Sequence, residues 1–388
     1  MTKRATLSVL AVAVLAACSD QPTSVRRSPD LAPSKSAAAA AQLAGPRFIV
    51  TVVPRENPSA VARDHGVAPD FVYTHALNGF AGSISDAARS GLLRDARVTL
   101  VEPDGIAEAW DAAASWGLDR IDQRSLPLSG TYTYGSTGAG VTAYIIDTGI
   151  WTTHADFGGR ASVGFDAIGD GRNGIDCHGH GTHVAGTVGG ATYGVAKGVT
   201  LKAVRVLNCF GSGTWSQVIA GMDWVAGNRV LPAVANMSLG GGASSSVDAA
   251  VRGMIAKGVA TAVAAGNGNA AGIGQDACRY SPARVAEAMT IGATSSTDTK
   301  ASWSNYGKCV DFFAPGVAIT SDWLNGGTAT ISGTSMATPH TTGVAAQYLA
   351  LNTGATPAAV SGALAANTTK GVVKNSKTAN NHLLFTNY

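Results

Sequence analysis

The chain has 388 residues, of which only 14% are charged, and its net charge is +3. This length allows one large domain and a smaller one, and the weak charge gives no footprint for binding nucleic acid. The 45% hydrophobic content excludes a disordered chain, and the 48 glycines favour a tightly packed fold with close backbone approaches.

Residues 1–18 predict an export signal. A positive stretch at residues 2–4 precedes an apolar run, 7–17, that is too short to span a bilayer. The run ends in Leu-Ala-Ala-Cys, which resembles a bacterial lipobox, so Cys18 is the candidate lipid anchor of the precursor. An ordinary cleaved signal with an incidental cysteine is the alternative. Both interpretations predict secretion, and no later stretch is apolar enough for a transmembrane helix.

The segment 19–46 is rich in Ser, Ala, Pro and Gln, which predicts a flexible tether. A first folded unit follows over residues 47–110. We expect its strands at 48–53, 71–77, 80–84 and 98–101, and its helices at 59–65 and 86–95, the second capped by Asp86. The order β-α-β-β-α-β predicts a small ferredoxin-like domain. Because this unit has no plausible catalytic constellation, an inhibitor or folding aid is favoured over a second activity.

Residues 111–388 change to strands that alternate with helices. Short apolar runs at 141–146, 201–206, 233–237 and 259–264 are typical of buried parallel strands, and 215–225 and 247–256 read as helices. This alternation predicts a doubly wound, mainly parallel α/β sheet. Ligands of such sheets bind beyond the carboxyl ends of the strands.

Three segments carry candidate catalytic residues. Asp147 follows the first apolar run in Asp-Thr-Gly, and His180 lies in His-Gly-Thr-His-Val-Ala-Gly. Ser335 lies in Gly-Thr-Ser-Met-Ala-Thr-Pro-His, at the start of a long helix toward residue 351, with Pro339 expected within its first turns. Taken singly, Asp147 could cap a turn and Ser335 a helix. A histidine metal site is disfavoured because no HExxH pattern occurs.

Together these segments resemble the signatures of subtilisin-like serine proteases, closest to the proteinase K branch, and they occur in that family's order. The resemblance covers about residues 112–388. It implies Ser335 as nucleophile, His180 as general base and Asp147 as the acid that orients the imidazole. An esterase of the α/β-hydrolase type would need another residue order and a Gly-x-Ser-x-Gly motif.

The implied protein is a secreted, monomeric serine endopeptidase that cleaves polypeptides with broad specificity through an acyl-enzyme. The alternative is a catalytically inactive, peptide-binding homologue, which would lack a residue of the triad. All three triad residues are present. Val-Ala-Ala-Gly-Asn at 263–267 resembles the family's oxyanion segment, so Asn267 and the Ser335 amide are the expected oxyanion donors; an ordinary turn residue before Gly268 is the alternative for Asn267.

Two segments resemble the walls along which the family binds a substrate strand. They are Gly211, Ser212 and Gly213, and Ser238, Leu239 and Gly240. Generic glycine-rich turns are the alternative. Binding through the peptide backbone implies broad specificity, and we expect an apolar or aromatic side chain before the cleaved bond.

Four cysteines remain once Cys18 is set aside, namely Cys177, Cys209, Cys278 and Cys309. An even number in an exported chain favours disulfides, and the sequence alone leaves three pairings open. No CxxC pair occurs, so a zinc site is disfavoured. The spacing resembles aqualysin-like members of the proteinase K branch, which implies the pairs Cys177–Cys209 and Cys278–Cys309.

Structural calcium is also implied by the resemblance. One expected site is Asp311 with the carbonyls of Ala286 and Ala288, and the other is Asp119, Asp122 and Gln123, where Ser129 replaces a carboxylate of some relatives. Surface salt bridges are the alternative for both sets. No catalytic cofactor is expected.

The first folded unit resembles the family's inhibitory propeptide in position, size and strand order. The segment that follows it is able to lie in the active-site cleft as a bound product. We therefore expect the precursor to cleave itself between Glu108 and Ala113, with the propeptide as an intramolecular inhibitor.

Overall fold

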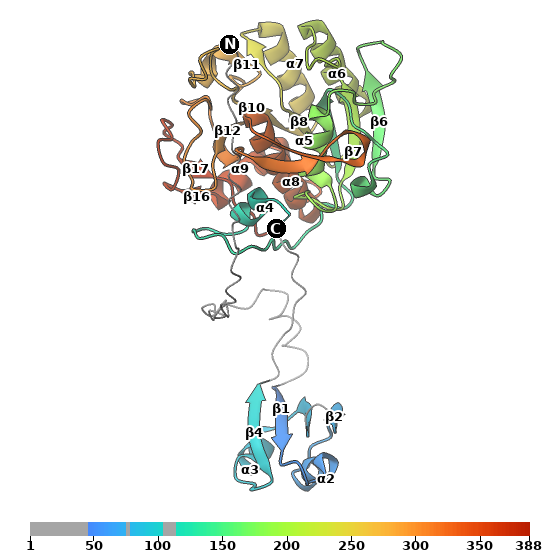
Figure 1. Ribbon diagram of the computed structural model, residues 1–388, viewed down its shortest axis with the longest axis vertical. Helices are drawn as coiled ribbons and strands as arrows, with labels where there is room; N and C mark the ends of the chain where they lie inside the picture. Colours follow the sequence, from blue (N-terminus) through green and yellow to red (C-terminus); the bar gives the residue numbers. More distant parts are fainter. Residues whose placement is uncertain (1–45, 75–77, 104–113) are drawn as a thin grey trace, which may run out of the picture. The chain divides into compact units, whose positions relative to one another are not determined.

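The structure, a computed structural model, describes residues 46–74, 78–103 and 114–388. The chain divides into two compact units, Met1–Glu108 and Ala109–Tyr388, which are treated separately below (Figure 1). Within the described ranges, no helix is long and apolar enough to cross a membrane. The predicted signal with Cys18, nearly all of the tether and most of the predicted cleavage region lie outside the described residues.

The first unit has the predicted β-α-β-β-α-β order. Its elements are β1 (Arg47–Val52), α2 (Pro58–Asp64), β2 (Phe71–Tyr73), β3 (Gly79–Ser83), α3 (Asp86–Leu92) and β4 (Val98–Pro103). The strands form an antiparallel sheet in the order β2-β3-β1-β4, over a core that includes Val50, Phe80 and Leu92. The predicted cap of α3 was wrong: Ser85, one residue earlier, accepts the amide of Ala88.

The second unit is built on a nine-stranded sheet in the order β16-β17-β13-β12-β10-β8-β5-β7-β6. Its strands are β5 (Thr142–Asp147), β6 (Ala161–Asp166), β7 (Thr200–Arg205), β8 (Ala233–Met237), β10 (Val259–Ala264), β12 (Met289–Thr294), β13 (Phe312–Pro315), β16 (Thr369–Lys370) and β17 (His382–Leu383). Only the β16–β17 pair is antiparallel within this sheet. The predicted mainly parallel sheet is therefore confirmed.

Two small antiparallel pairs and the helices complete this unit. The pairs are β9 (Gly241–Gly242) with β11 (Tyr280–Ser281) and β14 (Ile319–Asp322) with β15 (Thr328–Ile331). The helices are α4 (Trp116–Ile121), α5 (His180–Gly189), α6 (Trp215–Asn228), α7 (Ser245–Ala256), α8 (Thr334–Leu351) and α9 (Pro357–Asn367), with the short turns η1 (Ala155–Phe157), η2 (Ala277–Arg279) and η3 (Leu324–Gly326).

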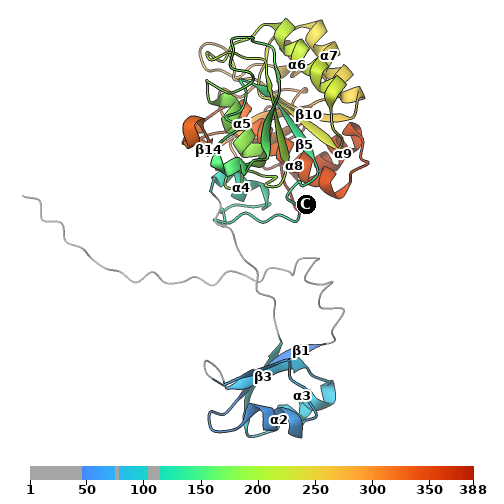
Figure 2. The same ribbon diagram turned by 90° about the vertical axis from the view of Figure 1, so that its right-hand side faces the viewer.

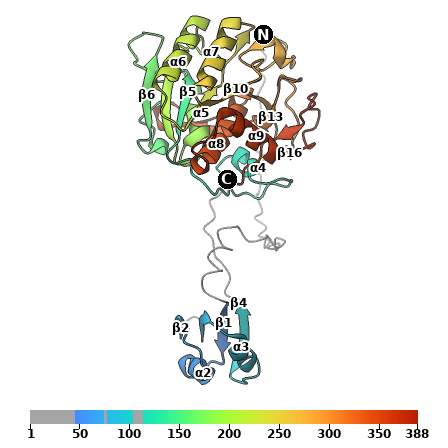
Figure 3. The same ribbon diagram turned by 180° about the vertical axis from the view of Figure 1, so that it is seen from behind.

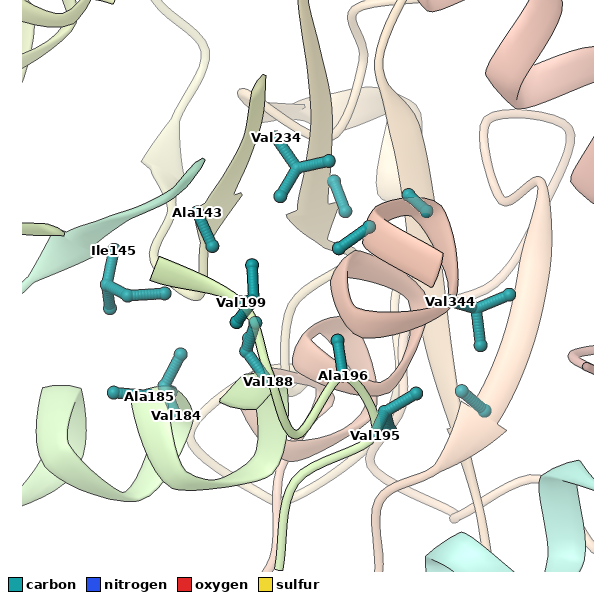
Figure 4. Close-up of a cluster of buried hydrophobic side chains, with 14 of the residues drawn as sticks. Ala143, Ile145, Val184, Ala185, Val188, Val195, Ala196, Val199, Val234 and Val344 are labelled. Carbon is teal, nitrogen blue, oxygen red and sulfur yellow. The ribbon is translucent and has the colours of Figure 1, made fainter. Parts of the chain in front are cut away.

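Helices cover both faces of the large sheet. Strand β5 sends Tyr144 and Ile146 into a core shared with α6 and α7, and Ala143 and Ile145 into a core shared with α5 and α8. Figures 2 and 3 show α6 and α7 side by side, and Figure 4 shows Ala143 and Ile145 facing Val184 on α5. This alternation follows from the two-residue period of a strand that is buried on both faces.

The predicted strands at 233–237 and 259–264 match β8 and β10 residue for residue. The strands β6, β12 and β13 were not predicted. β12 reads Met-Thr-Ile-Gly-Ala-Thr and is fully buried, but its small and hydroxylated residues lack the branched apolar signal of a core strand. Burial there depends on the neighbouring strands.

Candidate active site

The three predicted catalytic residues come from separate elements of the second unit. Asp147 is the last residue of strand β5, which lies between β8 and β7 in the sheet, His180 is the first residue of α5, and Ser335 is the second residue of α8. The carboxyl end of a parallel strand is thus next to the starts of two helices. This is the edge at which such sheets bind ligands.

Asp147 and His180 form a direct hydrogen bond. His180 Nδ1 lies 2.7 Å from Asp147 Oδ1, and the same oxygen accepts the amide of Thr148 at 2.7 Å. Burial lowers the pKa of His180, but the charge of the fully buried Asp147 and its hydrogen bond outweigh burial, so the pKa is raised overall. The carboxylate therefore fixes the ring with Nε2 facing away from it and favours the imidazolium.

Asp176, which the sequence analysis did not single out, organises the entry to α5. Its Oδ1 accepts the Thr148 hydroxyl and the amides of His178 and Gly179, and its Oδ2 accepts the amide and hydroxyl of Thr182. The turn after Asp147 is thereby tied to the first turn of α5. Its place directly before the Cys-His-Gly-His motif was the available signal.

The Ser335 hydroxyl is hydrogen bonded to a second serine rather than to the histidine. Its hydroxyl donates to Ser238 O at 3.1 Å, and no hydrogen bond to His180 occurs among the described residues. A loose nucleophile–base contact is common when no substrate is bound. Rotation about one side-chain bond moves the hydroxyl without moving α8.

Pro339 is the sixth residue of α8, later than the first-turn position in which a missing amide costs nothing. The position of Pro339 beyond the first turn has a structural consequence. Without an N–H at Pro339, the carbonyl of Ser335 four residues earlier has no helical partner. Ser238 Oγ donates to that carbonyl at 2.7 Å. Ser238 thus fixes both the carbonyl and the hydroxyl of Ser335.

Two donors converge beside Gly333. Asn267 Oδ1 accepts the amide and hydroxyl of Thr334, which leaves Nδ2 as the free end of the Asn267 amide. A Cβ built on Gly333 would lie 3.5 Å from Asn267 Nδ2 and 3.5 Å from the Ser335 amide nitrogen. The structure therefore places the two predicted oxyanion donors around one small space.

The predicted binding walls line one cleft. All six residues of the two wall segments, Gly211–Gly213 and Ser238–Gly240, border a hollow of about 680 Å³ together with His180. A second hollow of about 210 Å³ beside Ser335 and Asn267 is bordered by the backbone of 264–268 and by Ala283. This second hollow was not predicted, because its lining comes from segments that are distant in the sequence.

Both disulfides in the structure have the pairing implied by the resemblance. Cys177 and Cys209 have a Cα separation of 5.0 Å, and Cys278 and Cys309 one of 5.3 Å. The first bond joins the segment before His180 to the loop that forms one wall of the cleft. In the described part of the chain, the sole cluster of three metal-ligating side chains includes these same two sulfurs, which are already bonded to each other.

The predicted calcium residues form two separate sites, one with the buried Asp119 and the half-buried Asp122 and the other with the half-buried Asp311. Asp119 accepts the amide and hydroxyl of Ser129 and the amide of Gly130. Asp122 Oδ1 is buried with no partner, and burial raises the pKa of Asp122 to about 6. Gln123 Oε1 accepts the amide of Ser129 in the same loop. A buried carboxylate oxygen without a donor fits a hard cation.

At the other predicted calcium site, Asp311 Oδ2 accepts the amide of Thr290, which lies two residues after Ala288 in the sequence. Burial raises the pKa of Asp311 to about 6. Ala286 and Ala288 lie on the segment that leads into β12, beside Asp311 at the start of β13. The donors available here are one carboxylate and backbone carbonyls, a set that also suits calcium.

The other histidines near the site have structural partners. His183 Nε2 lies 3.0 Å from Ile319 O, and His340 Nδ1 lies 2.9 Å from Met336 O. Burial lowers the pKa of each to about 4. His178 borders the large cleft. His180 is therefore the histidine of this region whose pKa is raised.

Comparisons with known proteins agree with this geometry. Residues 138–385 match the Subtilase family. The chain is 57% identical over 326 residues to an extracellular serine proteinase of Thermus sp. strain Rt41A, covering 83% of this chain and 78% of the relative. It is 49% identical over 329 residues to an alkaline serine exoprotease A of Vibrio alginolyticus, covering 83% of this chain and 61% of the relative.

A crystal structure of a cold adapted subtilisin-like serine proteinase aligns with a TM-score of 0.68 and 54% identity, covering 71% of this chain and 98% of that one. The chain belongs to the subtilase family of serine proteases. The predicted resemblance to subtilisin-like enzymes is confirmed, and similarity to active proteinases disfavours the inactive alternative.

Proposed function

We propose that this chain is a secreted serine endopeptidase of broad specificity whose triad is Asp147, His180 and Ser335. The observation that carries the proposal is the 2.7 Å bond from His180 to Asp147, in a cleft that leads to Ser335 and two converging oxyanion donors. The similarity to an extracellular serine proteinase and to an alkaline serine exoprotease supports serine protease activity.

In the first half-reaction, Ser335 Oγ attacks the carbonyl carbon of the scissile peptide bond. His180 Nε2 takes the hydroxyl proton, and the resulting imidazolium is stabilised by Asp147 Oδ1 at Nδ1. The carbonyl oxygen becomes negative and receives hydrogen bonds from Asn267 Nδ2 and the Ser335 amide. His180 then gives its proton to the leaving amine, which leaves an acyl-enzyme on Ser335.

In the second half-reaction, water replaces the leaving amine. His180 removes a proton from the water, which attacks the acyl carbonyl, and the same oxyanion donors stabilise the second tetrahedral intermediate. Collapse returns the proton to Ser335 Oγ and releases the new carboxyl end of the peptide. Every proton transfer passes through one ring nitrogen of His180.

The cleft supports binding through the peptide backbone. Glycines and serines make up both wall segments apart from Leu239, so the backbone of an extended peptide can approach and add itself as a strand. The hollow beside Ser335 has Ala264, Ala265 and Ala283 in its lining, which supports an apolar side chain before the cleaved bond. We propose polypeptides, rather than one defined peptide sequence, as the substrate class.

A fluorophosphonate probe followed by peptide mapping tests the nucleophile. We expect a single label on Ser335 in the active protein and none in Ser335→Ala or after prior treatment with a sulfonyl fluoride. A label on another serine, in a folded protein that cleaves casein, would contradict the proposed mechanism. Internal cleavage of an end-blocked peptide distinguishes an endopeptidase from an exopeptidase.

We propose that the first unit, residues 47–110, is an intramolecular inhibitor removed by self-cleavage between Glu108 and Ala113. Its separate core and its clustering as an independent unit support a removable domain. Ser335→Ala should accumulate as an uncut precursor, and added active enzyme should cut it in trans. Normal maturation of purified Ser335→Ala would refute self-cleavage.

We propose that calcium binds at Asp311 with the Ala286 and Ala288 carbonyls, and at Asp119, Asp122 and Gln123. The partnerless, buried Asp122 Oδ1 is the strongest support. Calcium would neutralise the carboxylates of these loops and stabilise the folded state by mass action. Chelation should lower Tm in the wild type, and Asp122→Asn should reduce that loss. An Asp122→Asn protein with an undiminished chelation effect would contradict this site.

We also propose that Cys18 is lipidated in the precursor, so that the lipid stays with the removed segment and mature enzyme is released. Labelling cells with a fatty acid analogue should mark the precursor but not the mature form. Cys18→Ser should lose the label and still be processed. A label on the mature protein would contradict the proposed cleavage order.

A further inference from the structure

Three chain segments that carry the triad meet again at the far end of α5, away from His180. The turn η1 follows Asp147 in the chain, α5 begins with His180, and the hairpin β14–β15 precedes Ser335. Both η1 and β14 contact α5. The hairpin also reaches the start of α5, where the ring of Trp323 fills the space beside Gly179.

Asp322, the last residue of β14, is buried at this junction without a donor. Its side chain is 1% exposed, and neither Oδ1 nor Oδ2 accepts a hydrogen bond from a nitrogen or hydroxyl donor. A Cβ built on Gly190, directly after α5, would collide with Asp156 Oδ2 and lie 2.9 Å from Asp322 Oδ2. The carboxyl groups of Asp156 and Asp322 therefore converge on one point over the end of α5.

The ring of His154 presents an acceptor to Asp322, and the buried hydroxyl of Ser321, which lies near the same point beside Gly186, makes no hydrogen bond with it. His154 Nδ1 lies 3.7 Å from Asp322 Oδ1, and it already accepts the amide of Asp156 at 3.2 Å. His154 Nε2 lies 3.0 Å from Gly327 O, and a carbonyl only accepts, so the ring proton is on Nε2. The ring atom of His154 that faces Asp322 is thus the one that accepts the Asp156 amide.

The nearby cation is engaged elsewhere. Arg160 donates to the carbonyls of Gly189, Val199 and Asp156, and it acts on Asp322 only through space. The remaining neighbour on α5 is backbone at Gly186. A buried carboxylate that accepts no hydrogen bond is very costly, and a bound proton removes both its charge and its repulsion from the Asp156 carboxylate.

Asp156 is the partner whose carboxylate oxygens accept hydrogen bonds from donor groups. The amide of Thr192 donates to both of its carboxylate oxygens, and the Thr192 hydroxyl donates to Oδ1 at 2.5 Å. Asp322 has no such donors. Burial first, then the charge of Asp156 and a hydrogen bond with it, raise the pKa of Asp322 to about 8, while Arg160 acts in the opposite direction.

We propose that Asp322 is a protonated acid at neutral pH that donates a hydrogen bond to the Asp156 carboxylate, and that this acid pair positions the triad by joining the segments that carry Asp147, His180 and Ser335. Asp156 and Asp322 are positioning residues, because neither lines the substrate cleft. The pair links η1 to the hairpin across the end of α5.

The pair makes stability depend on pH in a defined direction. An unfolded aspartate loses its proton near pH 4, whereas Asp322 in the folded chain keeps it until about pH 8. Between these values the folded state binds more protons, so stability falls as pH rises and stops falling above pH 8. This contribution changes the folding equilibrium about tenfold per pH unit.

Asp322→Asn tests the proposal in the full chain with Ser335→Ala present throughout to prevent self-digestion. Asparagine stays neutral and can still donate to Asp156. The Tm difference between Asp322→Asn and its parent should grow from pH 5 to pH 8 and then stay constant. A Tm difference that does not change with pH would overturn the proposal. A Tm difference that disappears when calcium is added at constant pH would also overturn it, because that result indicates a bound cation.

An infrared titration gives a direct readout that a merely structural role would not produce. The parent should show the carbonyl band of a protonated carboxylic acid at pH 7 that disappears near pH 8. Asp322→Asn should lack this band, and the control Asp311→Asn should keep it. If Asp322→Asn does not fold, Asp156→Asn replaces it and should shift the disappearance of the band to lower pH. A band absent from the parent refutes the acid pair.

Discussion

Gly333→Ala is expected to block the oxyanion hole while leaving the fold intact. The φ angle of Gly333 is 169°, an extended conformation that alanine adopts without strain. The new methyl carbon would lie 3.5 Å from both Asn267 Nδ2 and Ser335 N. An oxyanion must sit about 2.7–3.1 Å from the same two nitrogens, so the methyl group and the oxygen compete for one space.

Loss of one oxyanion donor costs about 10²–10³ in kcat, and Gly333→Ala should show a loss of at least that size. Because the methyl group obstructs a charge that develops only in the transition state, KM should change little. Asn267→Ala removes one donor without adding bulk. The double variant should lose less than the product of the two single losses, because both act on the same oxygen.

The assay is kcat and KM on a chromogenic peptide, normalised by titration of active sites. Gly362→Ala is the matched control, because a Cβ at this position of α9 meets nothing within 4 Å; it should retain wild-type kinetics, and its Tm should not fall, because alanine favours a helix over glycine. If Gly333→Ala keeps full kcat, the converging donors do not bind the oxyanion. If its Tm falls sharply, the loss of activity reports folding instead.

Three further outcomes are expected. Because an imidazolium cannot act as a base, the raised pKa of His180 should place the acid limb of the kcat/KM profile above 6.5, the ordinary pKa of histidine. Asp147→Asn should move this limb to lower pH and reduce kcat by about 10⁴, as measured in a pH–rate profile. Ser238→Ala leaves Ser335 O without its donor and should cost about 1–3 kcal/mol in unfolding free energy; an unchanged Tm in calorimetry would contradict the role of this bond. Phe210 is 87% exposed at the rim of the cleft, so Phe210→Ser should raise KM for peptides with bulky apolar residues but not for glycine-rich ones, and equal KM changes for both would argue against substrate contact.

The sequence alone specified the chemistry of the site. Asp147, His180 and Ser335 stand in long local motifs, and each motif also encodes the strand end or helix start that presents its residue. Strands β8 and β10 could be bounded because their apolar runs are short and contiguous. A short sequence pattern is enough to predict a feature when residues that are neighbours in the chain determine that feature.

Only the tertiary structure revealed the features that depend on contacts between distant segments. The bond from Ser238 Oγ to the Ser335 carbonyl exists because Pro339 withholds a helical donor, and neither serine signals this in its own motif. Asp156 and Asp322 read as ordinary polar residues in the sequence. Folding brings them together over α5, and burial without donors then changes the proton affinity of Asp322.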